Sequence, residues 1–130
     1  MNKLLRISVI TLTAALFFLA GCRASPVYNV ENAPIQISSN HSSKDITKAI
    51  QRAGIALGWQ MKAKKPGHIV GTLYLRTFVA VVDIRYTPKS YSITYKSSSG
   101  LNYDGTNIHK NYNGWVQNLD RRIQGQLSAL

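Results

Sequence analysis

The alternation of apolar and polar positions predicts a run of β-strands in the middle of the chain. Residues 59–63 and 69–75 carry apolar side chains at odd positions, and the sequence "KKPG" between them is typical of a turn. Residues 78–86 carry apolar side chains at even positions, and residues 91–95 alternate again after the turn sequence "TPKS". These segments predict an antiparallel meander of three to four strands.

The change of parity between Leu75 and Phe78 leaves two arrangements open. A tight turn at Arg76-Thr77 would separate two strands, whereas a bulge at the same place would leave one long strand. Because neither Arg76 nor Thr77 is a favoured hairpin residue, the sequence does not choose between them.

Two segments with a helical period of apolar positions flank the strands. The first begins at Ser42, where Asp45 completes a pattern like a capping box, and Gly58 ends it. Thr106 or Asn107 can cap the second helix. The apolar positions of the first helix are Ile46, Ala49, Ile50, Ala53 and Leu57, and those of the second are Ile108, Tyr112, Trp115, Leu119 and Ile123.

The order α-β-β-β-β-α predicts an α+β fold. Helices with one apolar face and a sheet with one apolar face bury these faces against each other, which gives a two-layer sandwich. We expect the sheet to pack against both amphipathic helices within residues 42–126, with residues 127–130 as a frayed tail.

The N-terminal residues have the pattern of an export signal. Lys3 and Arg6 precede an uncharged apolar run of about 14 residues, which suits a signal peptide over residues 1–21. The run ends in Leu19-Ala20-Gly21-Cys22, which resembles the lipobox of bacterial prolipoproteins. The alternative is that Cys22, the one cysteine of the chain, is an incidental thiol near an ordinary cleavage site.

The lipobox resemblance implies a lipid anchor at Cys22 and therefore a membrane location in the bacterial envelope. Several acyl chains hold a protein on a bilayer far longer than one chain does. Residue 23 is Arg and not Asp, which by the same resemblance favours the outer over the inner membrane. Residues 22–41 contain two prolines and several asparagines, so we expect a tether there, with a short strand at Val27–Val30 or Ile35–Ile37 as the alternative within it.

The mature chain is strongly basic. The whole sequence has 16 basic and 5 acidic residues; without Lys3 and Arg6 the net charge is +9. A charge of this sign suits an anionic partner. Because export separates the protein from nucleic acid, the expected partners are lipopolysaccharide, anionic lipid or peptidoglycan. The alternative is that the charge serves solubility alone.

Six basic residues are candidates for contact with an anionic surface. Three of them stand at i, i+4 and i+8 on the first predicted helix, where an ordinary solvated face is the alternative interpretation. The candidates are Lys44, Lys48, Arg52, Arg76, Arg85 and Lys89.

Motifs for catalysis or metal binding are not evident in the sequence. His41, His68 and His109 are far apart and form no ligand pair at helical spacing. Asp83 and Arg85 share one face of a predicted strand, where we expect a charge-assisted pair. We therefore predict a protein that acts by binding, with no catalytic residues, no metal and no cofactor.

Tyrosines interleaved with basic residues in the strands allow a second interpretation. Such a surface can stack sugars, although strands also favour tyrosine at half-buried positions, which we prefer. The tyrosines concerned are Tyr74, Tyr86, Tyr91, Tyr95 and Tyr103.

Three pieces of the mature sequence resemble a known family. The stretches "AVVDIRY", "YSITY" and "IHKNYNGW" are similar to recurring pieces of a family of small uncharacterised bacterial lipoproteins, over about residues 55–120. The resemblance implies an intact domain of that type and carries over no catalytic residue. A protein-binding accessory subunit of an envelope complex, acting by strand addition, is the alternative function.

Overall fold

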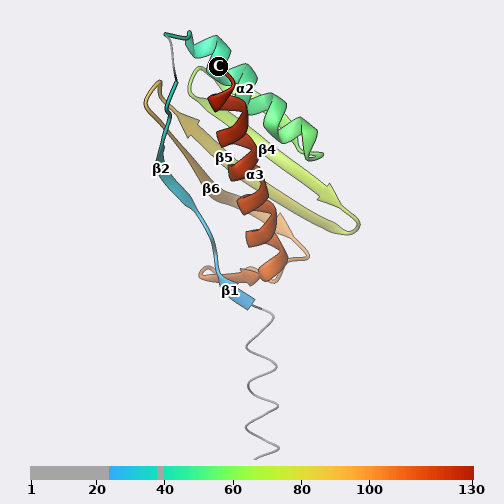
Figure 1. The fold of residues 1–130 in the computed structure, drawn as a ribbon. Coiled ribbons are helices and arrows are strands. Elements are labelled where there is room, and N and C mark those ends of the chain that lie inside the picture. Colours follow the sequence, from blue (N-terminus) through green and yellow to red (C-terminus); the bar gives the residue numbers. More distant parts are fainter. Residues whose placement is uncertain (1–23, 38–39) are drawn as a thin grey trace, which may run out of the picture.

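The computed structural model describes residues 24–37 and 40–130. Its main body is a five-stranded antiparallel sheet with the strand order β2-β6-β5-β4-β3, and two helices cover one face of it (Figure 1). The predicted α+β fold with the sheet packed against two helices is confirmed. The elements are β1 (Ala24–Pro26), β2 (Val30–Pro34), α2 (Ser43–Ala56), β3 (Gln60–Lys65), β4 (His68–Leu75), β5 (Phe78–Tyr86), β6 (Ser90–Ser99), β7 (Asn107–His109) and α3 (Lys110–Ser128).

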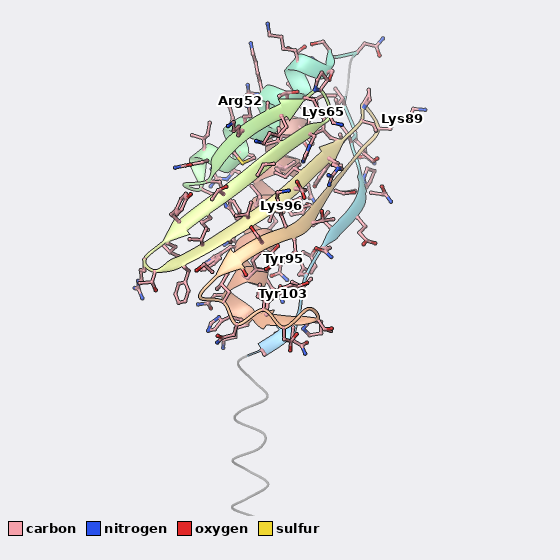
Figure 2. All side chains as sticks on the ribbon, turned by 180° about the vertical axis from the view of Figure 1, so that it is seen from behind. Arg52, Lys65, Lys89, Tyr95, Lys96 and Tyr103 are labelled. Carbon is pink, nitrogen blue, oxygen red and sulfur yellow. The ribbon has the colours of Figure 1, made fainter. Side chains whose placement is uncertain are left out.

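The meander β3-β4-β5-β6 follows the alternation of the sequence. Apolar residues at even positions of β5 face the helices, and Ala80, Val82 and Ile84 are fully buried there. The odd positions face the opposite side of the sheet, which neither helix of the described residues covers (Figure 2). We call this side the open face.

A two-residue turn separates β4 from β5. Leu75 pairs with Phe78, so Arg76 and Thr77 form the turn, and the backbone of Arg76 has a φ of 56°. A left-handed arginine is unfavourable locally, which explains why the sequence did not choose between the turn and the bulge. The pairing of β4 with β5 over their whole length outweighs that cost.

The expectation of a tether over residues 22–41 is corrected by β1 and β2. β2 is the edge strand beside β6, and Val30 enters the core opposite Ile93. A register shift between Val30 and Ala33, with Asn32 at a φ of 52°, interrupts the alternation that would have revealed this strand. Edge strands tolerate asparagine and proline, so the composition did not reveal it either. Cys22 lies outside the described residues.

Helix α2 matches its prediction closely. Ser42 is the N-cap, and its side chain and that of Asp45 bond to each other's backbone in a capping box. The predicted face is buried from Ile46 to Ala53, while Ile55 points into solvent with 62% exposure.

Helix α3 begins later and ends later than expected. Residues 107–109 form β7, so His109 and not Thr106 or Asn107 is the N-cap. The expected frayed tail is corrected as well, because α3 continues to Ser128 and Leu127 is buried in the core. Leu127 stands four residues after Ile123 and extends the same apolar face.

Candidate anion-binding groove

The structure distributes the six predicted basic residues over four places. All six are exposed. Arg52 and Lys89 lie at opposite sides of the molecule in Figure 2. Helix α2 carries Lys44, Lys48 and Arg52, the β4–β5 turn carries Arg76, the open face carries Arg85, and the β5–β6 turn carries Lys89.

Two of these residues line a groove between α2 and the end of β3. Lys44 and Lys48 form one wall, and Lys64 and Lys65 of β3 form the other. The groove has a volume of about 590 Å³ and is open to solvent. We call this feature the lysine groove.

The sequence revealed only one wall of the lysine groove. The spacing of Lys44 and Lys48 places them on one helix face, whereas the sequence "KKPG" indicates only a turn. Adjacent strand residues normally point to opposite faces. A register shift between Ala63 and Lys65 breaks that rule, and both Lys64 and Lys65 line the groove. No local pattern could have predicted this.

Tyr86 fastens both walls of the groove. Its hydroxyl is hydrogen-bonded to the side chain of Thr47 on α2, and its backbone N–H donates to the carbonyl oxygen of Gly67 at 3.0 Å. Gly67 closes the turn after β3 with a φ of 84°, a conformation that favours glycine. Because Tyr86 is itself 7% exposed, both walls are fixed to the core.

Glycines set the distance between α2 and β3. A Cβ on Gly54 of α2 would lie 2.3 Å from the sulfur of Met61, and one on Gly71 of β4 would lie 3.2 Å from the same sulfur. The Met61 side chain thus fits between two glycines. Gln51 adds a hydrogen bond from its side-chain amide to the backbone carbonyl of Met61 at 3.4 Å.

Among the described residues, the lining of the lysine groove contains four lysines and no acidic residue. The nearest acid on α2, Asp45, accepts a hydrogen bond from the backbone N–H of Ser42 at 3.3 Å. That bond and the Ser42 side chain hold the pKa of Asp45 below its ordinary value. Asp45 therefore stays ionised as a helix cap.

The donor set suits phosphate or carboxylate groups. Lysine presents a compact charge on a flexible stem and binds such oxygens without a fixed bidentate geometry. Ser43, Thr47 and Gln51 add neutral polar groups to the same lining. The groove can therefore hold an anion of variable shape.

The open face carries a second basic cluster, but it is already neutralised in part. Asp83 is only 8% exposed, and its carboxylate lies 2.7 Å from His68 Nε2, 3.7 Å from Arg85 Nη1 and 3.8 Å from Lys96 Nζ. Lys96 lies near the centre of this face (Figure 2) and is the extra residue of a bulge in β6. The predicted pair of Asp83 with Arg85 is confirmed, and two further bases join it.

Arg52 is also engaged within the protein. Its Nε donates to the side-chain oxygen of Gln126 on α3 at 3.1 Å. Of the three predicted helix residues, only Lys44 and Lys48 line the groove.

The histidines and other reactive groups are dispersed. His41 bonds to the carbonyl oxygen of Leu130, His68 to Asp83, and His109 accepts from the backbone N–H of Asn111. In residues 24–37 and 40–130, no three His, Cys, Asp or Glu side chains are grouped as metal ligands.

The tyrosines do not form a common platform. Tyr86 and Tyr91 are buried in the core, more deeply than the half-buried positions that the sequence predicts. Tyr95 packs at 4.0 Å between ring centroids against Tyr103 and at 5.7 Å against Tyr112 of α3. Tyr95 therefore faces the helix layer, away from the cluster around Asp83.

Comparison with known proteins gives no relative: no family model, no curated protein and no solved structure matches the chain. Neither helix of the described part of the chain is long and apolar enough to cross a bilayer.

Proposed function

We propose that this protein is a non-catalytic lipoprotein of the bacterial envelope that binds anionic envelope material in the lysine groove. The observation that carries the proposal is the convergence of Lys44, Lys48, Lys64 and Lys65 on one groove without an acidic residue in its lining. The proposal needs no cofactor and no metal.

The lipid anchor in this proposal rests on the sequence before the domain. The export signal and the lipobox-like Leu19-Ala20-Gly21-Cys22 support lipidation of Cys22. A lipidated protein meets the phosphates and carboxylates of the envelope at close range, and this chemistry matches the groove.

The ligand that suits the groove best is a polymer or surface with repeated anionic groups. A single exposed ion pair contributes only about 0–1 kcal/mol, so one isolated phosphate or carboxylate would be held weakly. Four lysines acting on neighbouring anionic groups add their contributions, and a membrane anchor raises the effective concentration of the domain beside its target.

A protein-binding accessory subunit is the second candidate function, and one observation favours it. Within the described part of the chain, β3 has a neighbouring strand on one side only, so its other edge can accept an added strand. This strand carries three lysines, Lys62, Lys64 and Lys65, whose charges disfavour pairing with most other strands. An acidic segment is the partner that suits this edge.

Co-sedimentation tests the proposed function. Mature chain carrying Cys22→Ser is mixed with lipopolysaccharide-containing vesicles, neutral vesicles and purified peptidoglycan sacculi, at low and near-physiological salt. We expect binding to at least one anionic target and not to neutral vesicles. Binding should weaken as salt rises, because screening shortens the range of the lysine charges.

Two double variants with equal charge make the test specific. Lys48→Gln with Lys64→Gln removes one lysine from each wall and should weaken binding, whereas Lys62→Gln with Arg76→Gln removes the same charge elsewhere and should not. Equal weakening by both pairs would assign the binding to net charge. Salt-independent binding of a protein partner would favour the accessory-subunit function instead.

A further inference from the structure

The lysine groove and the lipid anchor belong to opposite ends of the molecule. Figure 1 shows β1 and β7 at one end, and the start of α2 and the C-terminus at the other. In Figure 2, Lys65 lies at the end of the molecule where α2 starts, and Tyr103 lies at the opposite end, near β1. This arrangement decides which anionic material the groove can meet.

The anchor end is fixed to the folded domain with little slack. Only one residue separates Cys22 from Ala24, and Ala24 pairs with His109 in the β1–β7 ladder. Two residues span at most about 7 Å of extended chain. An anchor at Cys22 would therefore bring the β1–β7 end against the bilayer.

Further hydrogen bonds hold the chain after β1 onto α3. The Asn113 side chain accepts from the backbone N–H of Tyr28 and donates to the carbonyl oxygen of Pro26, both at 2.9 Å. The backbone N–H of Val27 donates to the carbonyl oxygen of Thr106 at 2.9 Å. These bonds keep residues 26–28 on the domain, so the β1 end of the domain stays close to the anchor.

Helix α3 separates the two ends. It runs from the β7 end to the C-terminus, and its 19 residues span about 28 Å. His41, just before α2, bonds to the carbonyl oxygen of Leu130 at 2.7 Å, so the start of α2 lies at the far end of α3. The electrostatic field of lipid headgroups decays over about 8 Å at physiological salt. With α3 upright on the bilayer, the lysine groove lies more than three decay lengths from the anchoring membrane.

The anchor end has side chains that suit a headgroup layer. Tyr28 and Tyr103 are 36% and 39% exposed there, and Lys110 is exposed at the start of α3. Tyrosine, with an apolar ring and a polar hydroxyl, is enriched where protein meets the membrane surface.

We infer that the lysine groove points away from the anchoring membrane and binds the carboxylates of the peptidoglycan wall, not the lipid headgroups of that membrane. The inference rests on the proposed function and specifies its ligand. An anchor in either membrane, with the domain in the periplasm, presents the groove to the wall.

A fluorescence experiment on the lipidated full chain tests the orientation. Since the lipid occupies the thiol of Cys22, a single new cysteine at Pro66→Cys beside the groove, or at Thr106→Cys beside β1, can carry a probe. Each labelled protein is placed in vesicles of phosphatidylcholine and phosphatidylglycerol with quenchers at the headgroups. We expect quenching at residue 106 and none at residue 66. Equal quenching at both would overturn the inference.

Capture of the same vesicles by purified sacculi tests the ligand. Vesicles that carry the lipidated wild type should be captured, and Lys48→Gln with Lys64→Gln should reduce capture about tenfold. The pair Lys62→Gln with Arg76→Gln is the matched control. If the groove pair weakens binding to anionic vesicles but leaves capture by sacculi unchanged, the inference is wrong and the proposed function stands.

Two controls separate failure of the inference from failure of the proposed function. Uptake of labelled fatty acid by the wild type, and its loss in Cys22→Ser, checks the anchor by itself. If the unlipidated chain binds neither sacculi nor any anionic vesicle, the proposed function is wrong, and the inference falls with it.

Discussion

Tyr91 and Tyr112 are both buried tyrosines whose hydroxyl groups have different surroundings. The Tyr91 hydroxyl donates to a carboxylate oxygen of Asp120 at 2.5 Å. The Tyr112 hydroxyl is buried and has no hydrogen-bond partner among the described residues. A buried polar group costs free energy unless it is paired, so the same substitution has opposite consequences at the two positions.

We predict that Tyr91→Phe destabilises the protein and Tyr112→Phe does not. Loss of the bond to the charged partner at Tyr91 should lower the free energy of unfolding by about 1.5–3 kcal/mol. Removal of the unpaired hydroxyl of Tyr112 should raise it by about 1 kcal/mol or leave it unchanged. Urea unfolding at neutral pH measures both, and a loss of stability in Tyr112→Phe like that in Tyr91→Phe would contradict the prediction.

Alkaline pH provides a control for the same pair. Burial, followed by the hydrogen bond to Asp120, raises the pKa of Tyr91 above its ordinary 10.0, and burial raises the pKa of Tyr112. Above pH 10 the unfolded chain loses protons that the folded chain keeps, so stability falls as pH rises. Tyr112 contributes at most about 1.4 kcal/mol per pH unit to this fall in the free energy of unfolding, and its contribution should vanish in Tyr112→Phe.

At the scale of elements, the contact of α2 with β3 determines the shape of the lysine groove. Met61 lies between Gly54 and Gly71, so the helix approaches the sheet as closely as the missing side chains allow. In contrast, a Cβ on Gly114 of α3 would meet nothing within 4 Å. The helical glycine Gly54 therefore makes room for Met61, whereas the helical glycine Gly114 makes room for no neighbour.

We predict opposite signs for alanine at these two glycines. Gly54→Ala should lower the free energy of unfolding by about 1–3 kcal/mol, because the new methyl group overlaps Met61. Gly114→Ala should raise it by about 0.5–1 kcal/mol, because alanine favours the helix and the space is open. Thermal unfolding measures both changes. Restoration of stability by Met61→Ala in the Gly54→Ala protein would assign the loss to this contact.

At the scale of the whole molecule, the segment before α2 completes the sheet. Val30 is part of the core, and Ala33, Ile35 and Ile37 pack against it from outside. β2 also covers the edge of β6, where the backbone N–H of Asn32 donates to the side chain of Ser92 at 2.9 Å. The composition suggests a domain boundary at residue 42. A chain that begins there lacks both the apolar contacts of β2 and its pairing with the edge of β6.

We predict that a chain beginning at residue 42 is markedly less stable than the mature chain. Loss of the apolar contacts of β2 should cost at least about 2 kcal/mol, and the exposed edge of β6 should promote aggregation. A chain beginning at Asn29 keeps β2 and is the control, which should elute as a species of the same oligomeric state as the mature chain. Calorimetry and size-exclusion chromatography compare the three chains, and equal stability of all three would show that β2 is dispensable.

The sequence by itself determined the features that depend on local interactions. The period of apolar residues predicted both helices and the meander, and the pattern at Ser42 and Asp45 predicted the observed capping box. The spacing of Asp83 and Arg85 on one strand predicted their ion pair. In each case the partners are near in the chain, so the order of residues carries the information.

Only the tertiary structure decided the features that join distant parts of the chain. Asn32 and Ser92, which hold β2 to the sheet, are 60 residues apart, and no local pattern records that pairing. The lysine groove likewise needs Lys44 and Lys48 on a helix to meet Lys64 and Lys65 on a strand. Close packing at Gly54 and a register shift in β3 bring these lysines to one groove. Both features depend on contacts that form only in the tertiary structure.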